Sequence, residues 1–414
     1  MLDNGLALSN CKTADVHIIN SCTVTGYSDK KVRQFLSKLR REQPQSVIIL
    51  TGCIPQSRVQ TDESVDDLCA DIIIGTQKRS EIFNLLTQYL ADKKRITAVE
   101  KYSASRDFET MMCKKISKKT RANIKIEDGC DNFCSYCIIP YARGRVRSRP
   151  LDDIAHQARI FADAGFKEIV LTGINLSAYG SDIGKTLCDA VHICCQTQGI
   201  ERVRLGSIET ERLGFDTIEA LSREKKLCPH FHLSLQSGSD NVLMAMNRKY
   251  TAEQYLALCK KMKELFENCA ITTDIIVGFP GETQSDFEKS LEMIEKVGFA
   301  DVHVFPYSQR AGTKAAKLPQ ISDFEKTQRA KIAEEKAKLS RESFLKSQIG
   351  TVHKVLFEHE NCTEFHTGYT ENYCRVNVHA NLREKSLQNK CFCVKIKEYD
   401  DFCLIGEIID EKIN

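Results

Sequence analysis

The sequence predicts an α/β protein built around a partial (β/α)6 barrel of the TIM type, with a small α/β domain before it and a small β-barrel after it. Three observations lead to this prediction. From Asn123 onward, strand-like apolar runs alternate with amphipathic helical runs six times, which implies a parallel sheet covered by helices. A shorter α/β alternation precedes this region. After Gly350 the pattern changes to short strands separated by turns.

The first region, residues 1–92, is expected to be an α/β domain. Its expected strands and helices are Val16–Asn20, Asp29–Arg41, Val47–Leu50, Asp71–Ile74 and Arg79–Leu90. Ligands of such sheets gather at the carboxyl ends of strands, where Cys22 and Cys53 stand. Two cysteines on neighbouring loops could share a metal cluster, although in isolation buried core thiols are the commoner use of such residues.

The barrel is expected over residues 120–348, after a linker over residues 93–119. Its expected strands are Asn123–Asp128, Glu168–Thr172, Arg202–Ser207, His230–Leu235, Thr272–Val277 and Val302–Pro306, with helices such as Asp152–Ala164, Gln284–Val297 and Asp323–Gln348. Functional residues of such barrels lie at the C-terminal ends of the strands. The residues found at those ends are Gly173, Glu209, Gln236, Ser237 and Gly278.

The last region, residues 349–414, is expected to form a small all-β barrel. Its expected strands are Val352–Glu358, Tyr373–Val378, Cys391–Lys397 and Leu404–Ile408. Small barrels of this size often bind oligonucleotides. A purely structural end cap is the alternative.

Composition narrows the class of protein. The 414 residues are 42% hydrophobic, no apolar run has the length of a membrane span, and the N-terminus lacks a signal-peptide pattern. Nineteen cysteines without an export signal favour a reducing, cytoplasmic location and metal binding over disulfides. The net charge of +3 is too small to indicate a nucleic-acid partner. Local clusters of basic residues are therefore better evidence for such a partner than the net charge. The alternating Arg143, Arg145, Arg147 and Arg149 suit phosphate contacts, or else a solvated basic face.

The most informative motif is Cys130, Cys134 and Cys137, spaced C-x3-C-x2-C in one short loop. A saturated structural zinc or an ordinary [4Fe–4S] cluster takes four thiolates, so three leave one corner open for a substrate or cofactor. The alternative is a zinc knuckle without its fourth ligand. The next histidine and cysteine along the chain, His156 and Cys188, are not close enough in sequence to complete it.

This spacing, with Tyr136 before the last cysteine, resembles the signature of radical S-adenosylmethionine (SAM) enzymes. Over almost its whole length the chain resembles the methylthiotransferases of the MiaB/RimO/MtaB group, with an N-terminal methylthiotransferase domain, a radical SAM barrel and an RNA-binding TRAM domain. Asn20–Cys22 and Leu50–Cys53 match two of the three cysteine loops that hold the family's auxiliary [4Fe–4S] cluster. The nearest likeness is to the MtaB branch, in the stretches Cys22–Thr25, Ile138–Gly144, Leu171–Asn175 and Gly368–Tyr373.

The resemblance implies a tRNA-modifying enzyme that methylthiolates C2 of N6-threonylcarbamoyladenosine at position 37, giving ms2t6A. It implies two [4Fe–4S] clusters, SAM, a tRNA substrate, an electron donor such as flavodoxin or ferredoxin, and no membrane partner. No side-chain acid or base can remove a ring hydrogen of adenine, so a cofactor must supply that chemistry. Cys130, Cys134 and Cys137 are the expected ligands of the catalytic cluster. Tyr136, Gly173, Glu209, Gln236, Ser237 and Gly278 are the candidates for binding SAM.

Two alternatives stay open at this point. The substrate could instead be N6-isopentenyladenosine at position 37 of tRNA, or an aspartate of a ribosomal protein. The chain could also be a catalytically impaired Fe–S protein that binds tRNA.

One departure from the family pattern concerns the N-terminus. The family's first auxiliary cysteine lies in a Gly-Cys-Lys-type loop thirty residues or more before the second, whereas only 21 residues precede Cys22. Cys11-Lys12 matches that motif by two letters, but Cys11 is interpreted as a loop residue. The N-terminus is therefore expected to be truncated, and the auxiliary cluster to be held poorly by Cys22 and Cys53.

Overall fold

The computed structural model describes residues 5–9, 13–23, 26–102, 107–113, 120–358, 364–379, 386–400 and 403–410. Cys11 lies outside these ranges. The chain divides into two compact units. The first comprises Met1–Met111, Asp128–Arg147 and Ser308–Leu318, and the second comprises Met112–Glu127, Ser148–Tyr307 and Pro319–Asn414. The three-cysteine loop therefore belongs to the same unit as Cys22 and Cys53.

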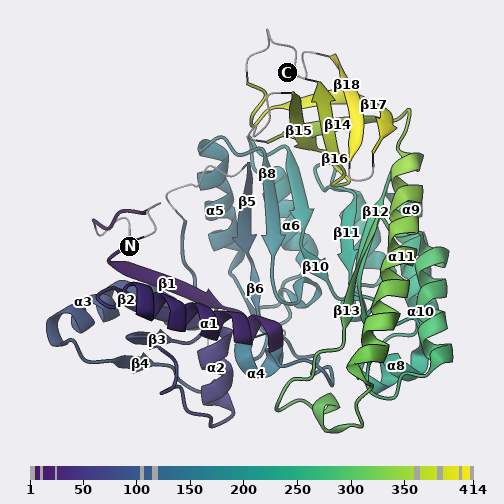
Figure 1. Cartoon of the computed structure of the whole chain (residues 1–414). Helices are drawn as coiled ribbons and strands as arrows, with labels where there is room; N and C mark the ends of the chain where they lie inside the picture. The colour runs from purple at the N-terminus through teal and green to yellow at the C-terminus, as the bar shows by residue number, and fades with distance from the viewer. Residues whose placement is uncertain are drawn as a thin grey trace. The chain divides into compact units, whose positions relative to one another are not determined.

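The first unit is built on a parallel four-stranded sheet (Figure 1). Its strands lie in the order β1 (Val16–Ser21), β2 (Val47–Gly52), β3 (Ile72–Ile74) and β4 (Ile96–Ala98). The helices are α1 (Gly26–Glu42), α2 (Cys53–Gln60) and α3 (Ile82–Asp92). Every residue of β2 is buried, as expected for a β-branched central strand of a parallel sheet. The predicted strands and the two predicted helices are confirmed. The sequence reading missed α2, and it missed β4 within the expected linker.

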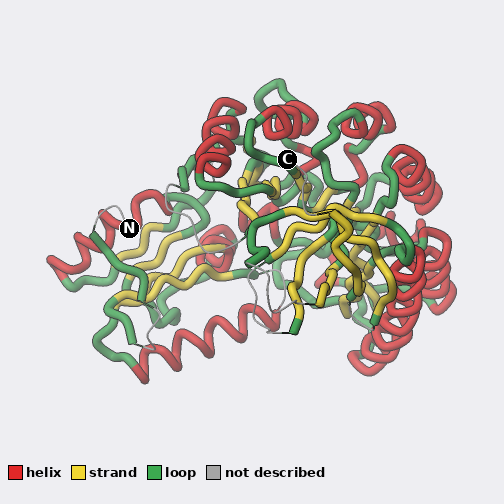
Figure 2. Tube along the Cα trace, turned by 90° about the horizontal axis from the view of Figure 1, so that it is seen from above, coloured by secondary structure: helices red, strands yellow, loops and turns green. Residues whose placement is uncertain are grey.

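The barrel strands belong to the second unit. They form two parallel sheets. The first contains β5 (Arg121–Lys125), β8 (Glu168–Thr172) and β9 (Arg202–Leu205). The second contains β10 (Ser207–Ile208), β11 (His230–Leu233), β12 (Ala270–Val277) and β13 (Asp301–Pro306). Only Gly206 separates β9 from β10, so six β/α units follow one another. The helices lie outside the strands (Figure 2). The predicted partial (β/α)6 architecture is confirmed.

The helices of this barrel begin and end where local chemistry favours it. They are α5 (Leu151–Asp163), α6 (Leu187–Gln196), α7 (Phe215–Ser222), α8 (Asp240–Ala245), α9 (Ala252–Leu265), α10 (Gln284–Val297) and α11 (Asp323–Ser347). Thr186, Thr251 and Thr283 each form a capping box at the start of α6, α9 and α10. Gly298 ends α10 in the left-handed conformation that favours glycine.

The C-terminal strands close into a five-stranded barrel within the second unit. They pair in the order β14 (Val352–Phe357), β15 (Phe365–Tyr369), β16 (Arg375–His379), β18 (Leu404–Asp410) and β17 (Cys391–Tyr399). This confirms the predicted small β-barrel and adds β15. No helix in the described ranges is long and apolar enough to cross a bilayer.

Candidate active site

The three-cysteine loop runs between β6 (Glu127–Asp128) and α4 (Ile139–Arg143). Its entry requires glycine, because Gly129 has φ +92° and a Cβ there would stand 2.0 Å from the Arg145 carbonyl oxygen. The Cys130 N–H donates to the Gly144 carbonyl at 3.0 Å, and the Cys137 N–H donates to the Cys134 carbonyl at 2.9 Å. These bonds fold the loop back on itself.

Backbone amides point at the sulfurs of this loop. The Asn132 N–H donates to Cys130 Sγ at 3.5 Å, and the Ile139 N–H donates to Cys137 Sγ at 3.4 Å. Donors aimed at sulfur favour the thiolate, which is the form that binds metal. The loop therefore suits an anionic, sulfur-ligated group.

Cys22 and Cys53 follow the ends of neighbouring strands, as predicted, although Cys53 begins α2 rather than lying on a loop. Their preceding residues, Ser21 and Gly52, are register partners at the ends of β1 and β2. Cys22 is exposed, while Cys53 is buried at the start of α2. Burial raises the pKa of the Cys53 thiol, the Arg143 guanidinium opposes this rise, and Cys22 is near enough to add to it.

The sequence reading missed the link between Cys53 and the three-cysteine loop. Arg143, from α4, donates its Nε–H to Cys53 Sγ at 3.1 Å, and its Nη1 lies 3.6 Å from Asp128 Oδ1. Arg147 Nη2 lies 3.6 Å from Asp128 Oδ2. One carboxylate thus holds two arginines beside the cysteines.

These contacts correct the expected role of the arginine run. Arg143 and Arg147 are used inside the protein, and Arg149 is buried beside Met112 Sδ, 2.9 Å away. Only Arg145 is largely exposed, stacked on the Phe133 ring at 4.6 Å. The prediction that this run makes phosphate contacts or forms a solvated basic face is therefore wrong for the buried Arg147 and Arg149, because alternation in sequence does not report which side chains find internal partners.

Glycines follow two strands of the second unit where the SAM pocket was predicted. Gly173 follows β8, and the next two amides donate to Glu127 Oε2 at 2.7 Å each. Gly278 follows β12 with φ +70°, and a Cβ there would lie 2.4 Å from Lys326 Cγ. Its N–H donates to Glu282 Oε2 at 2.7 Å. Both turns depend on a buried carboxylate that binds backbone amides.

The polar candidates differ in their surroundings. Glu209 forms an ion pair with Arg248. Gln236 adopts φ +67°, and both its N–H and its carbonyl oxygen form hydrogen bonds with the backbone of β12. Ser237 is fully buried, with its hydroxyl 3.3 Å from that of Ser290. Tyr136 is half-buried in the cysteine loop. The roles of these residues in SAM binding stay predictions.

Sequence reasoning did not find Glu127 or Arg248. Glu127 immediately precedes the cysteine loop and Arg248 lies in a polar turn after α8, so neither falls in a recognisable spacing. Only the fold brings Glu127 to the Gly173 turn and Arg248 to Glu209.

Comparison with known proteins assigns the family. Residues 124–294 match the Radical SAM superfamily, and residues 2–75 match the uncharacterized protein family UPF0004. Over 88% of this chain and 82% of the relative, the sequence is 36% identical to a threonylcarbamoyladenosine tRNA methylthiotransferase, MtaB, of Bacillus subtilis. The MtaB of Thermotoga maritima is 37% identical over 91% of this chain and 87% of its own length. The chain belongs to the radical SAM methylthiotransferases.

Other relatives fit this assignment. The tRNA-2-methylthio-N(6)-dimethylallyladenosine synthase of Acetivibrio thermocellus is 36% identical over 97% of this chain and 84% of its own length. A solved radical SAM methyltransferase, TsrM from Kitasatospora setae, shares the fold with a TM-score of 0.55 at 12% identity, over 73% of this chain and 63% of that one. The cofactors of radical SAM methylthiotransferases are SAM and [4Fe–4S] clusters, as predicted.

Proposed function

We propose that this methylthiotransferase acts on tRNA and methylthiolates C2 of N6-threonylcarbamoyladenosine at position 37. The main support is its 36–37% identity, over most of their length, to relatives named for threonylcarbamoyladenosine tRNA. The motifs shared with the MtaB branch also support this substrate. The comparable likeness to a dimethylallyladenosine synthase makes the substrate the first point to test.

Cys130, Cys134 and Cys137 are proposed to bind the [4Fe–4S] cluster that works with SAM. Amides already aimed at two of the sulfurs support this assignment, because they stabilise thiolates without any rearrangement of the loop. When bound, the cluster and SAM supply a radical able to remove hydrogen from an unreactive C–H bond. Gly173, Glu209, Gln236, Ser237 and Gly278 are proposed to bind SAM, and so is Tyr136.

Cys22 and Cys53 are proposed to bind the auxiliary cluster, where sulfur is inserted. Arg143 supports this role because it offers a charged N–H to a buried thiol whose ionisation burial disfavours. The carboxylate of Asp128 holds Arg143 in place for that contact. The third protein ligand is a separate question, since Cys11 lies outside the described residues.

The proposed division of the chain is a methylthiotransferase domain over 1–92, a linker over 93–119, a radical SAM domain over 120–348 and a TRAM domain over 349–414. The C-terminal barrel is proposed to bind the tRNA backbone. A flavodoxin or ferredoxin is proposed to supply the electron.

The deciding experiment is a choice of substrate. The reconstituted enzyme, with SAM and a reductant, is given tRNA carrying N6-threonylcarbamoyladenosine or tRNA carrying N6-isopentenyladenosine, and the nucleosides are analysed by mass spectrometry. We expect ms2t6A from the first and no methylthiolated product from the second. Product only from the second would replace the proposed substrate. SAM cleavage without methylthiolation of either would support the impaired Fe–S protein.

A further inference from the structure

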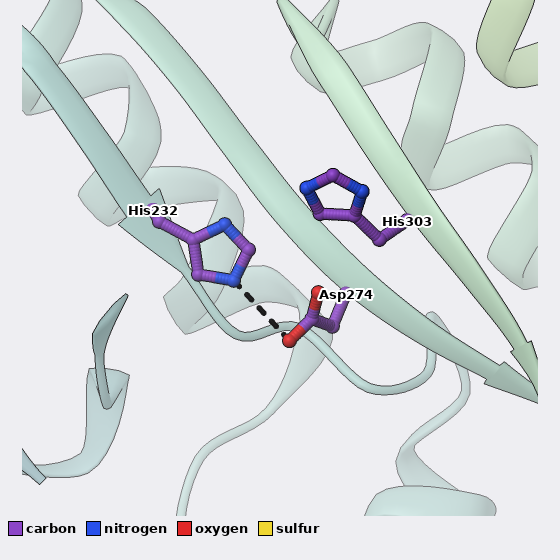
Figure 3. A group of neighbouring side chains, drawn as sticks. All are labelled: His232, Asp274 and His303. Carbon is purple, nitrogen blue, oxygen red and sulfur yellow. Dashed lines mark ion pairs between the residues drawn. The ribbon is translucent and has the colours of Figure 1, made fainter. Parts of the chain in front are cut away.

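Three polar side chains meet on one face of the second barrel sheet, away from the cysteines in sequence. They are His232 on β11, Asp274 on β12 and His303 on β13 (Figure 3). His232 Nε2 lies 3.2 Å from Asp274 Oδ2, and one ligand atom from each residue lies within 4.8 Å of the other two. This is the one such set among the described residues.

The strand register explains why these residues meet. Thr272 pairs with His232 and Asp301 pairs with Thr272, while Asp274 pairs directly with His303. Side chains alternate between the two faces of a strand. The intervening Phe231, Leu233 and Ile275 are fully buried in the hydrophobic core on the opposite face. The three polar residues therefore share the face that does not pack into this core.

The distances fit ligands that share one metal ion. Two ligands bonded at 2.0–2.1 Å to a tetrahedral zinc lie about 3.3 Å apart. The observed separation between His232 and Asp274 is 3.2 Å. The rings of His232 and His303 have centroids 5.8 Å apart, close to the roughly 5 Å expected for two imidazoles on one such ion.

A neighbouring hydroxyl orients the first histidine. Thr272 Oγ1 lies 2.9 Å from His232 Nδ1, on the opposite side of the ring from Asp274. Histidine ligands commonly use the second ring nitrogen in this way, which fixes the ring orientation. If Nδ1–H donates to Thr272, the lone pair of His232 Nε2 faces a carboxylate oxygen, and a cation between the two atoms relieves that repulsion.

A histidine–aspartate ion pair without a metal explains fewer of these observations than a metal site does. It accounts for His232 and Asp274 but not for the approach of His303, which is exposed at the edge strand β13 and could adopt other rotamers. Its exposure also gives an ion a path from solvent. Two imidazoles and one carboxylate form a ligand set that takes Zn²⁺ or Fe²⁺, and three protein ligands leave a position open for water or substrate.

We propose that His232, Asp274 and His303 form a binding site for one divalent cation of the zinc class, separate from the cysteine ligands. The Asp274 carbonyl accepts the Gln236 N–H at 2.8 Å, so the site is joined through the backbone to a strand end where the SAM pocket is proposed. The open coordination position gives the ion room to orient an oxygen or nitrogen atom of a bound molecule.

The test uses the full chain with its iron–sulfur clusters reconstituted. The protein is washed with a mild chelator, titrated with Zn²⁺ alone, and its zinc content is measured by mass spectrometry after gel filtration. We expect one zinc per chain, and at least a tenfold weaker affinity in Asp274→Asn and in His303→Ala. His192→Ala is the matched control, because His192 is a surface histidine that also contacts a carboxylate, that of Glu224, but belongs to no set of three neighbouring ligand residues in the part of the chain that the structure describes.

Zinc K-edge absorption identifies the ligands independently of affinity. We expect only nitrogen and oxygen at about 2.0–2.1 Å, with the outer scattering of imidazole. Sulfur at about 2.3 Å would place the zinc on cysteines and overturn the proposal. Failure of the wild-type protein to retain zinc, or equal retention by His303→Ala, would also overturn it. Because His303 lies on an edge strand and is exposed, that variant should fold, which cluster absorbance and circular dichroism verify.

Discussion

Arg143 Nε lies 3.1 Å from Cys53 Sγ and donates a hydrogen bond to it. The arginine comes from the helix that follows the three-cysteine loop, and the cysteine begins α2 in the N-terminal sheet domain. Burial raises the pKa of the Cys53 thiol, and the guanidinium is the largest influence that opposes this rise. One residue thus connects the two sets of cysteines that are proposed to hold clusters.

Replacing this arginine should therefore affect one proposed cluster and spare the other. In Arg143→Gln the buried Cys53 loses its charged donor, so its thiolate is less favoured and its iron site weakens. If the wild-type chain binds two [4Fe–4S] clusters, iron should fall from about eight toward about four per chain. The 5′-deoxyadenosine formed from SAM should persist. Arg145→Gln, which removes an exposed arginine two residues away, should leave iron content unchanged.

Substitution of a cysteine in the three-cysteine loop should instead abolish SAM cleavage. Cys134→Ala removes one of three proposed iron ligands, so SAM cleavage should fall to background. The measurement is 5′-deoxyadenosine formed with dithionite in the reconstituted protein. Cys69→Ala, which removes an exposed cysteine of the first unit, is the control and should keep wild-type yield. A wild-type yield from Cys134→Ala would refute the assignment.

The entry glycine of the same loop gives a backbone test. In Gly129→Ala the new Cβ would stand 2.0 Å from the Arg145 carbonyl oxygen, at a φ of +92° that disfavours alanine. The loop must then move, and both iron content and SAM cleavage should drop. Gly165→Ala controls for the strain of a positive φ alone, since no atom lies within 4 Å of its added Cβ. Equal behaviour of the two variants would show that the contact with Arg145 is unimportant.

The sequence predicted elements well where periodicity was strong. Glu168–Thr172 and Gln284–Val297 were predicted with the bounds that the structure has. It missed β15, where His366, Thr367 and Gly368 weaken the alternation, and the three-residue strand β4. Cysteine spacing located the candidate site because all three residues lie in one loop. The Arg143–Cys53 contact, 90 residues apart in sequence, depends on the fold and leaves no local pattern.

The C-terminal barrel offers a test of RNA binding. Lys395 and Lys397 are exposed on β17, where they alternate with the buried Val394 and Ile396. If both contact phosphates, Lys395→Gln/Lys397→Gln should weaken tRNA binding and reduce the slope of log K against log salt by about 1.5. Lys38→Gln, on α1, removes one exposed charge as a control. An unchanged slope in the double variant would favour the structural end cap.

The attachment of this barrel rests on a buried carboxylate. Glu168, at the start of β8, lies 2.9 Å from Arg202 Nη2 and 2.7 Å from Arg204 Nε. The two arginines in turn donate to the carbonyls of Tyr369 and Glu371 in the C-terminal barrel. Glu168→Gln leaves this pair of buried cations without their counter-charge. Removing one partner of a buried ion pair typically costs about 3–5 kcal/mol, so a clear fall in Tm is expected.

The same carboxylate predicts a dependence on pH. Burial alone would raise the pKa of Glu168, but Arg204 and Arg202 outweigh it, and the net result is a lowered pKa. A carboxyl whose pKa is lower in the folded state stabilises the protein above its unfolded pKa of about 4.3, and that stabilisation is lost as the pH falls through the folded value. The Tm of the wild type should therefore fall more steeply below about pH 4.3 than the Tm of Glu168→Gln. Glu219→Gln removes an exposed partner of Lys261 and should show the wild-type pH profile and a nearly unchanged Tm. Parallel profiles for wild type and Glu168→Gln would show that this carboxyl does not govern acid stability.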